Sequence, residues 1–489
     1  MAIPQNPSIY QADIRVWLRN LSDELDRAAL IDDIPDDKLS YLANIGIDYL
    51  YLIGGWSTGE AARNLFRSDS NCLTQHRNLL FDLTDSDICG SCYAIADYSV
   101  DKRLGGNSSL ERFRYRLYEQ NLLLILDFVP HITALDHSWV HERPDFYVHG
   151  KESDLESRPD RYKKEGSHII AHGRDPYFPA WRDTYQLNYG NPSLQDSMNK
   201  ELVKISKLCD GIRCDMAMLI QPEIFEWIWG IKSRPFWKNA INNVRGQFPD
   251  FIFVAEAYWD KETELQNEGF DFTYDKILYN KLRFENAGSV LDYLRRDITS
   301  QMKMVRFMEN HDEERAANAF SLNMHQSAAI ITYLSPGMKF FYDGQFEGRK
   351  KKPSINLNRW PDEPLEGTLQ KFYMNLLRIL NRSLFRAGDW RLLPCRTAWE
   401  GNLSWKSFIA FLWQSETIEP LLIVVNYGPN QGQCYVILPI PELQNSHILL
   451  RDIMSPASYH RDGDLLFYQG LYLDIPGWSY HIFEIESQE

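Results

Sequence analysis

Eight short apolar runs alternate with amphipathic stretches over the first 380 residues or so. Strands of a parallel sheet are buried on both faces and read as such continuous apolar segments. Between the runs, stretches such as 35–46, 108–121 and 193–208 place apolar residues three and four apart, the spacing of a helix with one buried face. Eight such strand–helix repeats predict an α/β fold, a closed (β/α)8 TIM barrel. The expected strands lie at 9–18, 47–55, 122–130, 211–219, 251–259, 270–278, 304–312 and 338–346.

Two stretches depart from this alternation. Residues 131–190 show no clear period and hold six of the twelve histidines, which indicates a small subdomain inserted after the third strand. From residue 385 onward, short alternating runs separated by turn residues predict a C-terminal antiparallel β-domain. We therefore expect a barrel formed by 1–130 and 191–384, an inserted subdomain at 131–190 and a β-sandwich at 385–489.

Composition and charge exclude several classes of function. The 489 residues are 44% hydrophobic and 24% charged, which suits one large globular domain with appendages. A net charge of −15 argues against a nucleic-acid partner. No apolar run approaches the ~20 residues of a membrane span, and the first residues lack the features of a secretory signal. We expect a cytoplasmic protein without a membrane partner, and the oligomeric state is left open.

Charged side chains occur where the expected strands end. Asp127 closes the third strand, Arg213 and Asp215 the fourth, and Glu256 the fifth, while Asn310, His311 and Asp312 close the seventh. In a β/α barrel the chemistry is located at these C-terminal strand ends. Each acid alone is as easily explained by a structural role, but four acids with an arginine and a histidine on one rim favour an active site.

The fourth and fifth strands suggest a division of roles between two acids. Arg213 and Asp215 are two residues apart, so they face the same side of a strand, and the guanidinium lowers the pKa of the carboxyl, as suits a nucleophile. Partial desolvation of Glu256 would raise its pKa and keep it protonated, as suits a general acid. An ionised and a protonated carboxyl ~5–5.5 Å apart are what retaining glycoside cleavage requires. Asp312, beside His311, suits the binding of sugar hydroxyls.

The same residues carry a family resemblance. The segments "DFVP", "GIRCDMAML", "FVAEAYWD" and "FMENHDEERA" resemble, in order and spacing, the strand motifs of the α-amylase superfamily of retaining glycoside hydrolases, glycoside hydrolase family 13. The segment "GSCYAIADYSVDKRLGG" is similar to the one after the second strand, and "LNYGNP" to the motif that closes that family's inserted subdomain. The resemblance covers the barrel, the insert and the terminal β-domain.

The resemblance implies a role for each matching residue. Three carboxylates would act on the bond that is cleaved: the nucleophile Asp215, the acid/base Glu256, and Asp312, which binds and distorts the sugar. Four further residues would support them: Arg213 orienting the nucleophile, His311 contacting sugar hydroxyls, Tyr93 stacking under the sugar ring and Asp127 supporting the site from the third strand.

The chain also departs from the family pattern. His131 and Ile132 stand where an Asn-His pair is usual, so the histidine that hydrogen-bonds the sugar's primary hydroxyl is missing, and the sequence leaves open whether His131 replaces it. The asparagine is a calcium ligand in many relatives. Gln186 replaces another ligand, and Met218-Leu219 replace a Lys-His pair. Because calcium prefers hard oxygen ligands, we expect the calcium site to be absent and no other metal or cofactor to be bound.

The substrate expected from the resemblance is an α-glucan. The first hypothesis is a retaining glycosidase that cleaves α-glucosidic bonds, α-1,4 bonds foremost, of maltooligosaccharides or glycogen- and starch-like glucans through a covalent glycosyl-Asp intermediate. The second is a transglucosylase, in which a sugar acceptor replaces water. The third, a catalytically weak glucan-binding protein, is favoured slightly by Ile132 and opposed by the intact Asp215, Glu256 and Asp312.

Overall fold

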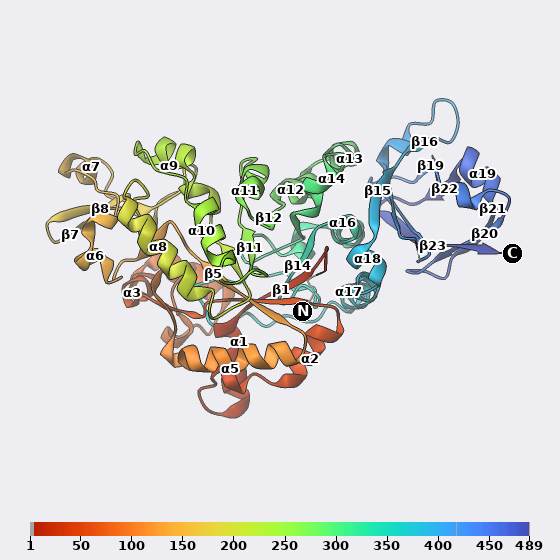
Figure 1. The fold of residues 1–489 in the computed structure, drawn as a ribbon. Helices are drawn as coiled ribbons and strands as arrows, with labels where there is room; N and C mark the ends of the chain where they lie inside the picture. Colours follow the sequence, from red (N-terminus) through yellow and green to blue (C-terminus); the bar gives the residue numbers. More distant parts are fainter. Residues whose placement is uncertain (1–3, 417, 489) are drawn as a thin grey trace. The chain divides into compact units, whose positions relative to one another are not determined.

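The barrel expected from the apolar runs is present in the computed structural model, which describes residues 4–416 and 418–488 (Figure 1). Within these residues, eight parallel strands close a barrel in the order β1-β14-β13-β12-β11-β10-β5-β2, so that each strand neighbours its successor in the chain. Each expected range overlaps one strand. Their bounds are β1 (Ser8–Asp13), β2 (Tyr49–Ile53), β5 (Leu123–Phe128), β10 (Gly211–Cys214), β11 (Ile252–Ala255), β12 (Phe272–Tyr274), β13 (Met304–Phe307) and β14 (Met338–Tyr342).

The three helices expected from their apolar periodicity are also confirmed. They are α2 (Asp36–Asn44), α5 (Gly106–Glu119) and α8 (Pro192–Ile205). In α5, for example, Leu110, Phe113 and Leu117 are buried at the three- and four-residue spacing of one helix face. Further helices with bounds used below are α9 (Pro222–Trp229), α10 (Trp237–Arg245), α11 (Glu262–Glu268), α13 (Ala287–Leu294), α14 (Ile298–Met302), α16 (Leu322–Leu334) and α17 (Gly367–Leu380).

All eight strands are shorter than the ranges predicted for them, and inside two of the ranges an aspartate begins an α-helix. β1 ends at Asp13, whose carboxylate accepts a hydrogen bond from Arg15 N at 2.9 Å and starts α1 (Ile14–Leu25). After β12, Asp275 accepts from Leu278 N at 3.0 Å and starts α12 (Lys276–Phe284). Aspartate is a favoured N-cap, so the apolar residues that follow it continue as one face of a helix.

The chain between β5 and α8 forms the expected insertion. In the described residues it contains a four-stranded sheet in the order β6-β9-β8-β7, at the orange and yellow end of Figure 1. β6 begins at Ile132, opposite Gln186 of β9, so the sheet starts almost immediately after β5. The bounds are β6 (Ile132–Ala134), β7 (Tyr162–Glu165), β8 (His168–Gly173) and β9 (Trp181–Gln186).

The C-terminal part is antiparallel, as expected. Its described strands form a six-stranded sheet, β15-β17-β18-β23-β20-β21, and a three-stranded sheet, β16-β19-β22. Leucine, isoleucine, valine and phenylalanine side chains from both sheets share one buried core. The bounds are β15 (Asp389–Leu393), β16 (Cys395–Thr397), β17 (Phe408–Gln414), β18 (Leu421–Asn426), β19 (Gly432–Val436), β20 (His447–Asp452), β21 (Ser458–Asp462), β22 (Leu471–Ile475) and β23 (Ser479–Gln488).

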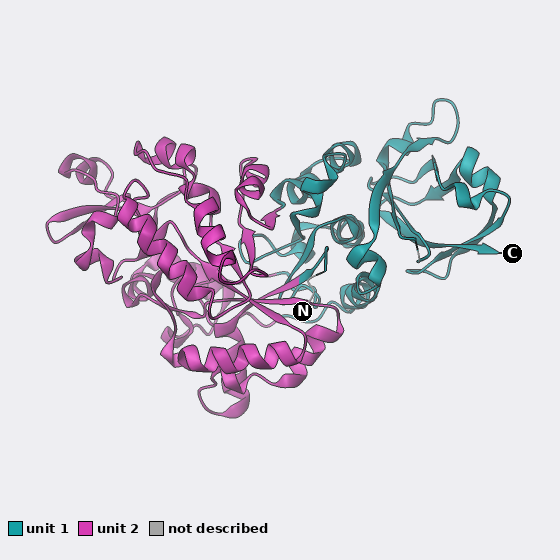
Figure 2. Ribbon diagram, in the orientation of Figure 1, with its two compact units in different colours: residues 1–8, 275–350, 363–489 teal, residues 9–274, 351–362 magenta. Residues whose placement is uncertain are grey.

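The chain divides into two compact units that differ from the predicted domains (Figure 2). One comprises 9–274 and 351–362 and contains the insert; the other comprises 1–8, 275–350 and 363–489 and contains the C-terminal sheets. The domain boundaries expected from the sequence stay predictions. Among the described residues, none of the helices has the length and apolarity needed to cross a bilayer.

Candidate active site

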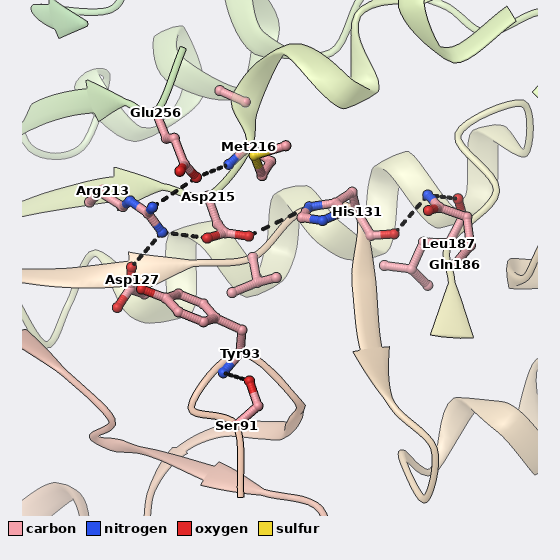
Figure 3. Close-up of polar contacts among 12 residues, drawn as sticks. Ser91, Tyr93, Asp127, His131, Gln186, Leu187, Arg213, Asp215, Met216 and Glu256 are labelled. Carbon is pink, nitrogen blue, oxygen red and sulfur yellow. Dashed lines mark hydrogen bonds and ion pairs between the residues drawn. The ribbon is translucent and has the colours of Figure 1, made fainter. Parts of the chain in front are cut away.

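One arginine at the end of the fourth barrel strand contacts three carboxylates (Figure 3). Arg213 Nη1 donates a hydrogen bond to Asp215 Oδ1 and lies 3.3 Å from Asp127 Oδ1. Its other terminal nitrogen, Nη2, forms an ion pair of 2.7 Å with Glu256 Oε2. All four side chains are buried. The register of the barrel accounts for part of this geometry, because Arg213 on β10 is paired with Asp127 on β5.

The neighbours of Arg213 stabilise its positive charge. Burial alone lowers the pKa of the guanidinium, but Glu256, Tyr51, Tyr93 and Asp215 outweigh burial, and the pKa lies well above its usual value. A permanent cation in contact with a carboxylate favours the ionised form of that carboxylate. Arg213 therefore provides the electrostatic setting that an aspartate nucleophile needs.

Glu256 is bound on both carboxylate oxygens. It follows the last residue of β11, and its Oε2 accepts a hydrogen bond from the backbone N of Met216 at 2.7 Å. Its Oε1 accepts from Tyr258 Oη at 2.8 Å. Met216 adopts a left-handed backbone with φ of 42°, which is uncommon for a residue with a long side chain. Met216 directly follows Asp215, and this backbone conformation turns its N–H toward Glu256. The peptide bond after Asp215 therefore donates a hydrogen bond to the second candidate catalytic acid.

Asp127, on β5, supports the cluster of Arg213, Asp215 and Glu256. Its Oδ1 accepts from Tyr51 Oη at 2.7 Å, and its backbone oxygen accepts from Trp56 Nε1 at 2.8 Å. Burial raises the pKa of Tyr51 well above its usual value, so the phenol stays a hydrogen-bond donor. Asp127 thus holds Arg213 in place, and its support of a catalytic site stays a prediction.

Tyr93 lies beside Arg213, on the same side as Asp127 (Figure 3). Its ring centroid is 5.4 Å from Arg213 Cζ, a distance at which an aromatic ring attracts a cation. Ser91 Oγ accepts a hydrogen bond from Tyr93 N at 3.2 Å, and the side chain is half-buried. The structure places Tyr93 beside the site, and its stacking under a sugar ring stays a prediction.

His131 lies next to the candidate nucleophile, although the usual family pattern has a histidine one residue later. Its Nδ1 is 3.9 Å from Asp215 Oδ2, and its ring meets Trp181 edge to face at 5.4 Å. The ring is fully buried, and neither of its nitrogens has a hydrogen-bond partner within the described residues. Burial, with a smaller contribution from Arg213, lowers the pKa of His131 to about 3. A neutral imidazole therefore flanks Asp215, whereas Ile132 pairs with Gln186 in the insert sheet.

The residues at the positions of the family's calcium ligands do not fit calcium. The Gln186 amide nitrogen donates to His131 O at 2.9 Å and to Leu187 O at 3.2 Å, while Met218 and Leu219 are buried apolar side chains. Calcium takes six to eight hard oxygen ligands, several of them charged. In the described part of the chain, no three His, Cys, Asp or Glu side chains are grouped to hold a metal ion. The expected absence of calcium stays a prediction.

His311 and Asp312 follow β13 in the other compact unit. His311 Nε2 lies 3.0 Å from Asp312 Oδ2, and Asn310 Oδ1 accepts from Asp312 N at 2.9 Å and from Glu313 N at 3.0 Å. His311 is buried, whereas the Asp312 side chain is 46% exposed. The turn made by Asn310 therefore presents one carboxylate to solvent with an imidazole behind it.

Three residues of this site are not predicted from the sequence. Tyr51 and Tyr258 bind Asp127 and Glu256, and Met216 supplies a backbone donor. Tyr51 is one of five buried residues of β2, so it looks like any core tyrosine, and Tyr258 lies in a loop without periodicity. Met216 differs from other loop residues only in its left-handed backbone conformation, and a methionine in the sequence does not indicate that conformation.

Comparison with known proteins assigns the fold and the family. The model of the alpha amylase catalytic domain matches residues 35–363. A noncanonic maltogenic alpha-amylase, AmyB, from Thermotoga neapolitana superposes with a TM-score of 0.70 at 18% identity, covering 99% of each chain. The Nostoc punctiforme debranching enzyme superposes with a TM-score of 0.63 at 17% identity, covering 99% of this chain and all of that one. At these identities the superpositions show the fold alone.

Two relatives add sequence similarity over about two thirds to three quarters of this chain. The 4-alpha-glucanotransferase of Thermotoga maritima is 22% identical over 344 residues, which span 66% of this chain and 69% of that protein. The alpha-amylase MalA of Haloarcula japonica is 20% identical over 369 residues, which span 74% of this chain and 47% of that protein. The family model matches more than half of this chain, and the acids lie at the ends of the barrel strands. This chain therefore belongs to the alpha-amylase catalytic-domain family, glycoside hydrolase family 13.

Proposed function

We propose that this protein is a retaining glycoside hydrolase that cleaves α-glucosidic bonds, α-1,4 bonds foremost, in maltooligosaccharides or glycogen- and starch-like glucans. The observation that carries the proposal is the guanidinium of Arg213, which binds Asp215 through one terminal nitrogen and Glu256 through the other. Two carboxylates held by one guanidinium lie close together, as a retaining mechanism with a ~5–5.5 Å separation requires.

The proposed reaction has two steps. In the first, Glu256 gives its proton to the glycosidic oxygen while an Asp215 oxygen attacks the anomeric carbon, so the leaving sugar departs and a glycosyl-aspartate ester forms. In the second, Glu256 takes a proton from water, and the water oxygen displaces Asp215 from the same carbon. The protonation of Glu256 expected from the sequence stays a prediction.

The remaining residues have roles that follow from their contacts. Arg213 keeps Asp215 ionised and oriented, and Asp127 holds Arg213. Asp312, exposed and backed by His311, suits the binding of sugar hydroxyls. Tyr93 would pack against the face of the sugar ring. No metal or cofactor takes part in this proposal, and a cytoplasmic location stays a prediction.

A transglucosylase is the second candidate. It uses the same ester, but a sugar hydroxyl replaces water in the second step. The relative from Thermotoga maritima bears the name 4-alpha-glucanotransferase, which favours this candidate. The third candidate is a catalytically weak glucan-binding protein, and the complete Arg213 cluster opposes it.

Product analysis distinguishes these three candidates. Purified protein is incubated with maltoheptaose, and products are followed by chromatography against a Glu256→Gln control. Hydrolysis gives shorter chains only, whereas transfer gives chains both longer and shorter than the substrate. If the unaltered protein and the Glu256→Gln variant both leave maltoheptaose and glycogen intact, the proposed enzymatic function is wrong.

A further inference from the structure

A cavity of about 650 Å³ lies against one face of α1, in the compact unit that contains Glu256. Its lining also comes from the loop after β2, from α3 (Glu60–Ser68) and from the segment after β4 (Ile95–Val100). Six of the described lining residues are arginines and three are aspartates, whereas the whole chain has 52 basic and 67 acidic residues. The arginines are Arg15, Arg19, Arg27, Arg63, Arg67 and Arg103. We call this space the arginine cavity, and its volume is typical of small-molecule sites.

Two of the six arginines are neutralised by neighbouring acids. Arg15 Nη2 lies 2.7 Å from Asp13 Oδ2, and Arg27 Nη2 lies 2.6 Å from Asp33 Oδ1. Arg15 also donates a hydrogen bond to Gly90 O at 3.0 Å, so it joins the start of α1 to the far wall. These two side chains hold the cavity together, and its capacity for a ligand depends on the remaining four arginines.

Three of the remaining arginines are grouped around fewer acids. Arg63 and Arg67 are one turn apart on α3, so they lie on the same face of the helix. Glu60 Oε1 accepts a hydrogen bond from Arg63 Nη1 at 3.0 Å and lies 3.7 Å from Arg103 Nη1, while Arg103 Nη2 is 2.5 Å from Asp101 Oδ2. Burial lowers the pKa of Arg63, and the charges of Arg103 and Arg67 lower it further. Glu60 does not offset these effects, so a bound anion would balance the excess positive charge.

Donors that the protein itself does not use are present in the same cavity. Arg67 is oriented by its Nη2, which donates to Asp85 O at 2.7 Å, but its buried Nε has no hydrogen-bond partner in the described part of the chain. Arg19 Nε lies 3.4 Å from Asp23 Oδ2 and likewise makes no hydrogen bond to a described residue. A buried donor without an acceptor is destabilising, so a ligand that supplies oxygen atoms at these positions would be stabilised there.

We propose that the arginine cavity binds a phosphorylated sugar, with the phosphate held by Arg63 and Arg67. A guanidinium presents a planar fork of N–H donors that matches a phosphate. Hydroxyl, amide and carboxylate groups for the sugar line the rest of the cavity: Ser22, Thr58, Ser86, Asn358, Asp23 and Asp26. Trp56 is the only aromatic residue in the described lining and is 4% exposed, so a nucleotide base would have no ring to stack on. The inference is independent of the proposed function, because the described lining includes none of the residues proposed to act on the glycosidic bond.

The experiment measures the binding of glucose 6-phosphate to the full chain by isothermal titration at low salt, where charge interactions are least screened. Arg63→Gln and Arg67→Gln should each raise the Kd about ten-fold, because each removes a charged donor pair from the phosphate. Arg112→Gln is the matched control: Arg112 on α5 pairs with Asp32 at 2.5 Å and lies outside the described lining. This variant loses the same charge, and its Kd should stay within about two-fold. Arg67→Lys, which keeps the charge, should recover part of the affinity.

Three further probes test the class of ligand. Inorganic phosphate should compete with glucose 6-phosphate but bind more weakly, because it lacks the hydroxyls that the sugar supplies. Glucose should not compete, because it lacks the phosphate. Adenosine monophosphate should bind more weakly than glucose 6-phosphate. Inorganic phosphate or adenosine monophosphate binding at least as tightly as glucose 6-phosphate would overturn the assignment to a phosphorylated sugar.

The outcomes separate this inference from the proposed function. Failure of the unaltered protein to bind glucose 6-phosphate, or equal Kd values in the unaltered protein and both glutamine variants, overturns the arginine cavity as a binding site. Neither result bears on the cleavage of maltoheptaose, which product analysis tests separately. Thermal melting verifies that each variant folds, and Arg67→Lys tests the same position if a glutamine variant does not.

Discussion

Arg213 shows how much of this site depends on a single buried side chain. Its two terminal nitrogens face Asp215, Asp127 and Glu256. Removal of one partner from a buried ion pair costs about 3–5 kcal/mol because a charge stays behind unpaired. The nucleophile can nevertheless be neutralised with little structural cost, since two carboxylates continue to balance the arginine.

Asp215→Asn should therefore abolish turnover without unfolding the protein. We expect kcat for maltoheptaose to fall by at least ~10³-fold, as when other covalent nucleophiles are removed. The Kd for maltoheptaose should stay within about three-fold, because the change removes one charge and preserves the shape. Turnover comes from reducing-end release and Kd from calorimetry. Unchanged turnover in a well-folded variant would remove Asp215 from the nucleophile role.

His131 predicts a specific pH dependence of stability. In the unfolded chain its pKa is near 6.5, whereas burial lowers it to about 3 in the folded protein. Between these values the unfolded state binds a proton that the folded state does not, so the free energy of unfolding falls as pH is lowered from about 6.5 to about 3. One proton corresponds to a slope of up to about 1.4 kcal/mol per pH unit.

His131→Asn should reduce that slope by one proton equivalent. Urea unfolding of the unaltered protein and of the His131→Asn variant, each at about pH 5 and pH 7, measures this difference in slope. His137 and His325, whose pKa values burial lowers to about 4, contribute in the same direction in both proteins and serve as the shared background. Identical slopes would mean that His131 is accessible to protons in the folded state.

At the scale of elements, the site is built where strands end and irregular backbone begins. Asp215 and Glu256 are each the first residue after a strand, and each is followed within three residues by a left-handed residue, Met216 or Trp259. A strained backbone conformation of this kind costs about 1–3 kcal/mol. The barrel strands supply the stability that offsets this strain, because their residues are buried.

The helix α12 offers a test of stability away from the site. Asp275 caps this helix, accepts a hydrogen bond from Tyr293 Oη at 2.6 Å and pairs with the buried Arg306 of β13. Asp275→Asn keeps the cap but leaves Arg306 without its counter-charge. We expect a loss of about 3 kcal/mol in the free energy of unfolding, measured with denaturant.

Asp297→Asn is the matched control for this helix. Asp297 also caps a helix, α14, through Ser300 N at 3.0 Å, but it is exposed. Asparagine is as good a cap as aspartate, so this variant should unfold within about 0.5 kcal/mol of the unaltered protein. Equal stability of the Asp275 and Asp297 variants would show that the Arg306 ion pair contributes little.

For the whole molecule, we expect stability to be independent of calcium. Histidine, amide and apolar side chains occupy the positions of the family's ligands, and calcium binds such groups poorly. A ligand that binds only the folded state raises Tm, so removal of a tightly bound ion would lower it. Addition of excess EDTA should leave Tm unchanged in a thermal melt. A fall in Tm that added calcium reverses would contradict this prediction.

The sequence by itself determined the barrel and the candidate acids. The eight strands were predictable because apolar runs reflect burial on both faces, a local pattern independent of the partners of each strand. Asp127, Arg213, Asp215 and Glu256 were predictable because parallel strands all end on one face of a barrel, so position along a strand indicates position on the rim. The boundaries were less accurate where an N-cap aspartate, Asp13 or Asp275, began a helix within an apolar run.

Only the tertiary structure decided which side chains meet. Tyr258 and the Met216 N–H bind Glu256, the His131 ring lies by Asp215, and Tyr177, Trp227 and Trp259 come from segments far apart in the chain. These contacts depend on strand register and on loops whose backbone conformation has no period, and neither leaves a signal in residue order. Residue types and strand ends are local properties, whereas the geometry that combines them into a site is a property of the folded chain.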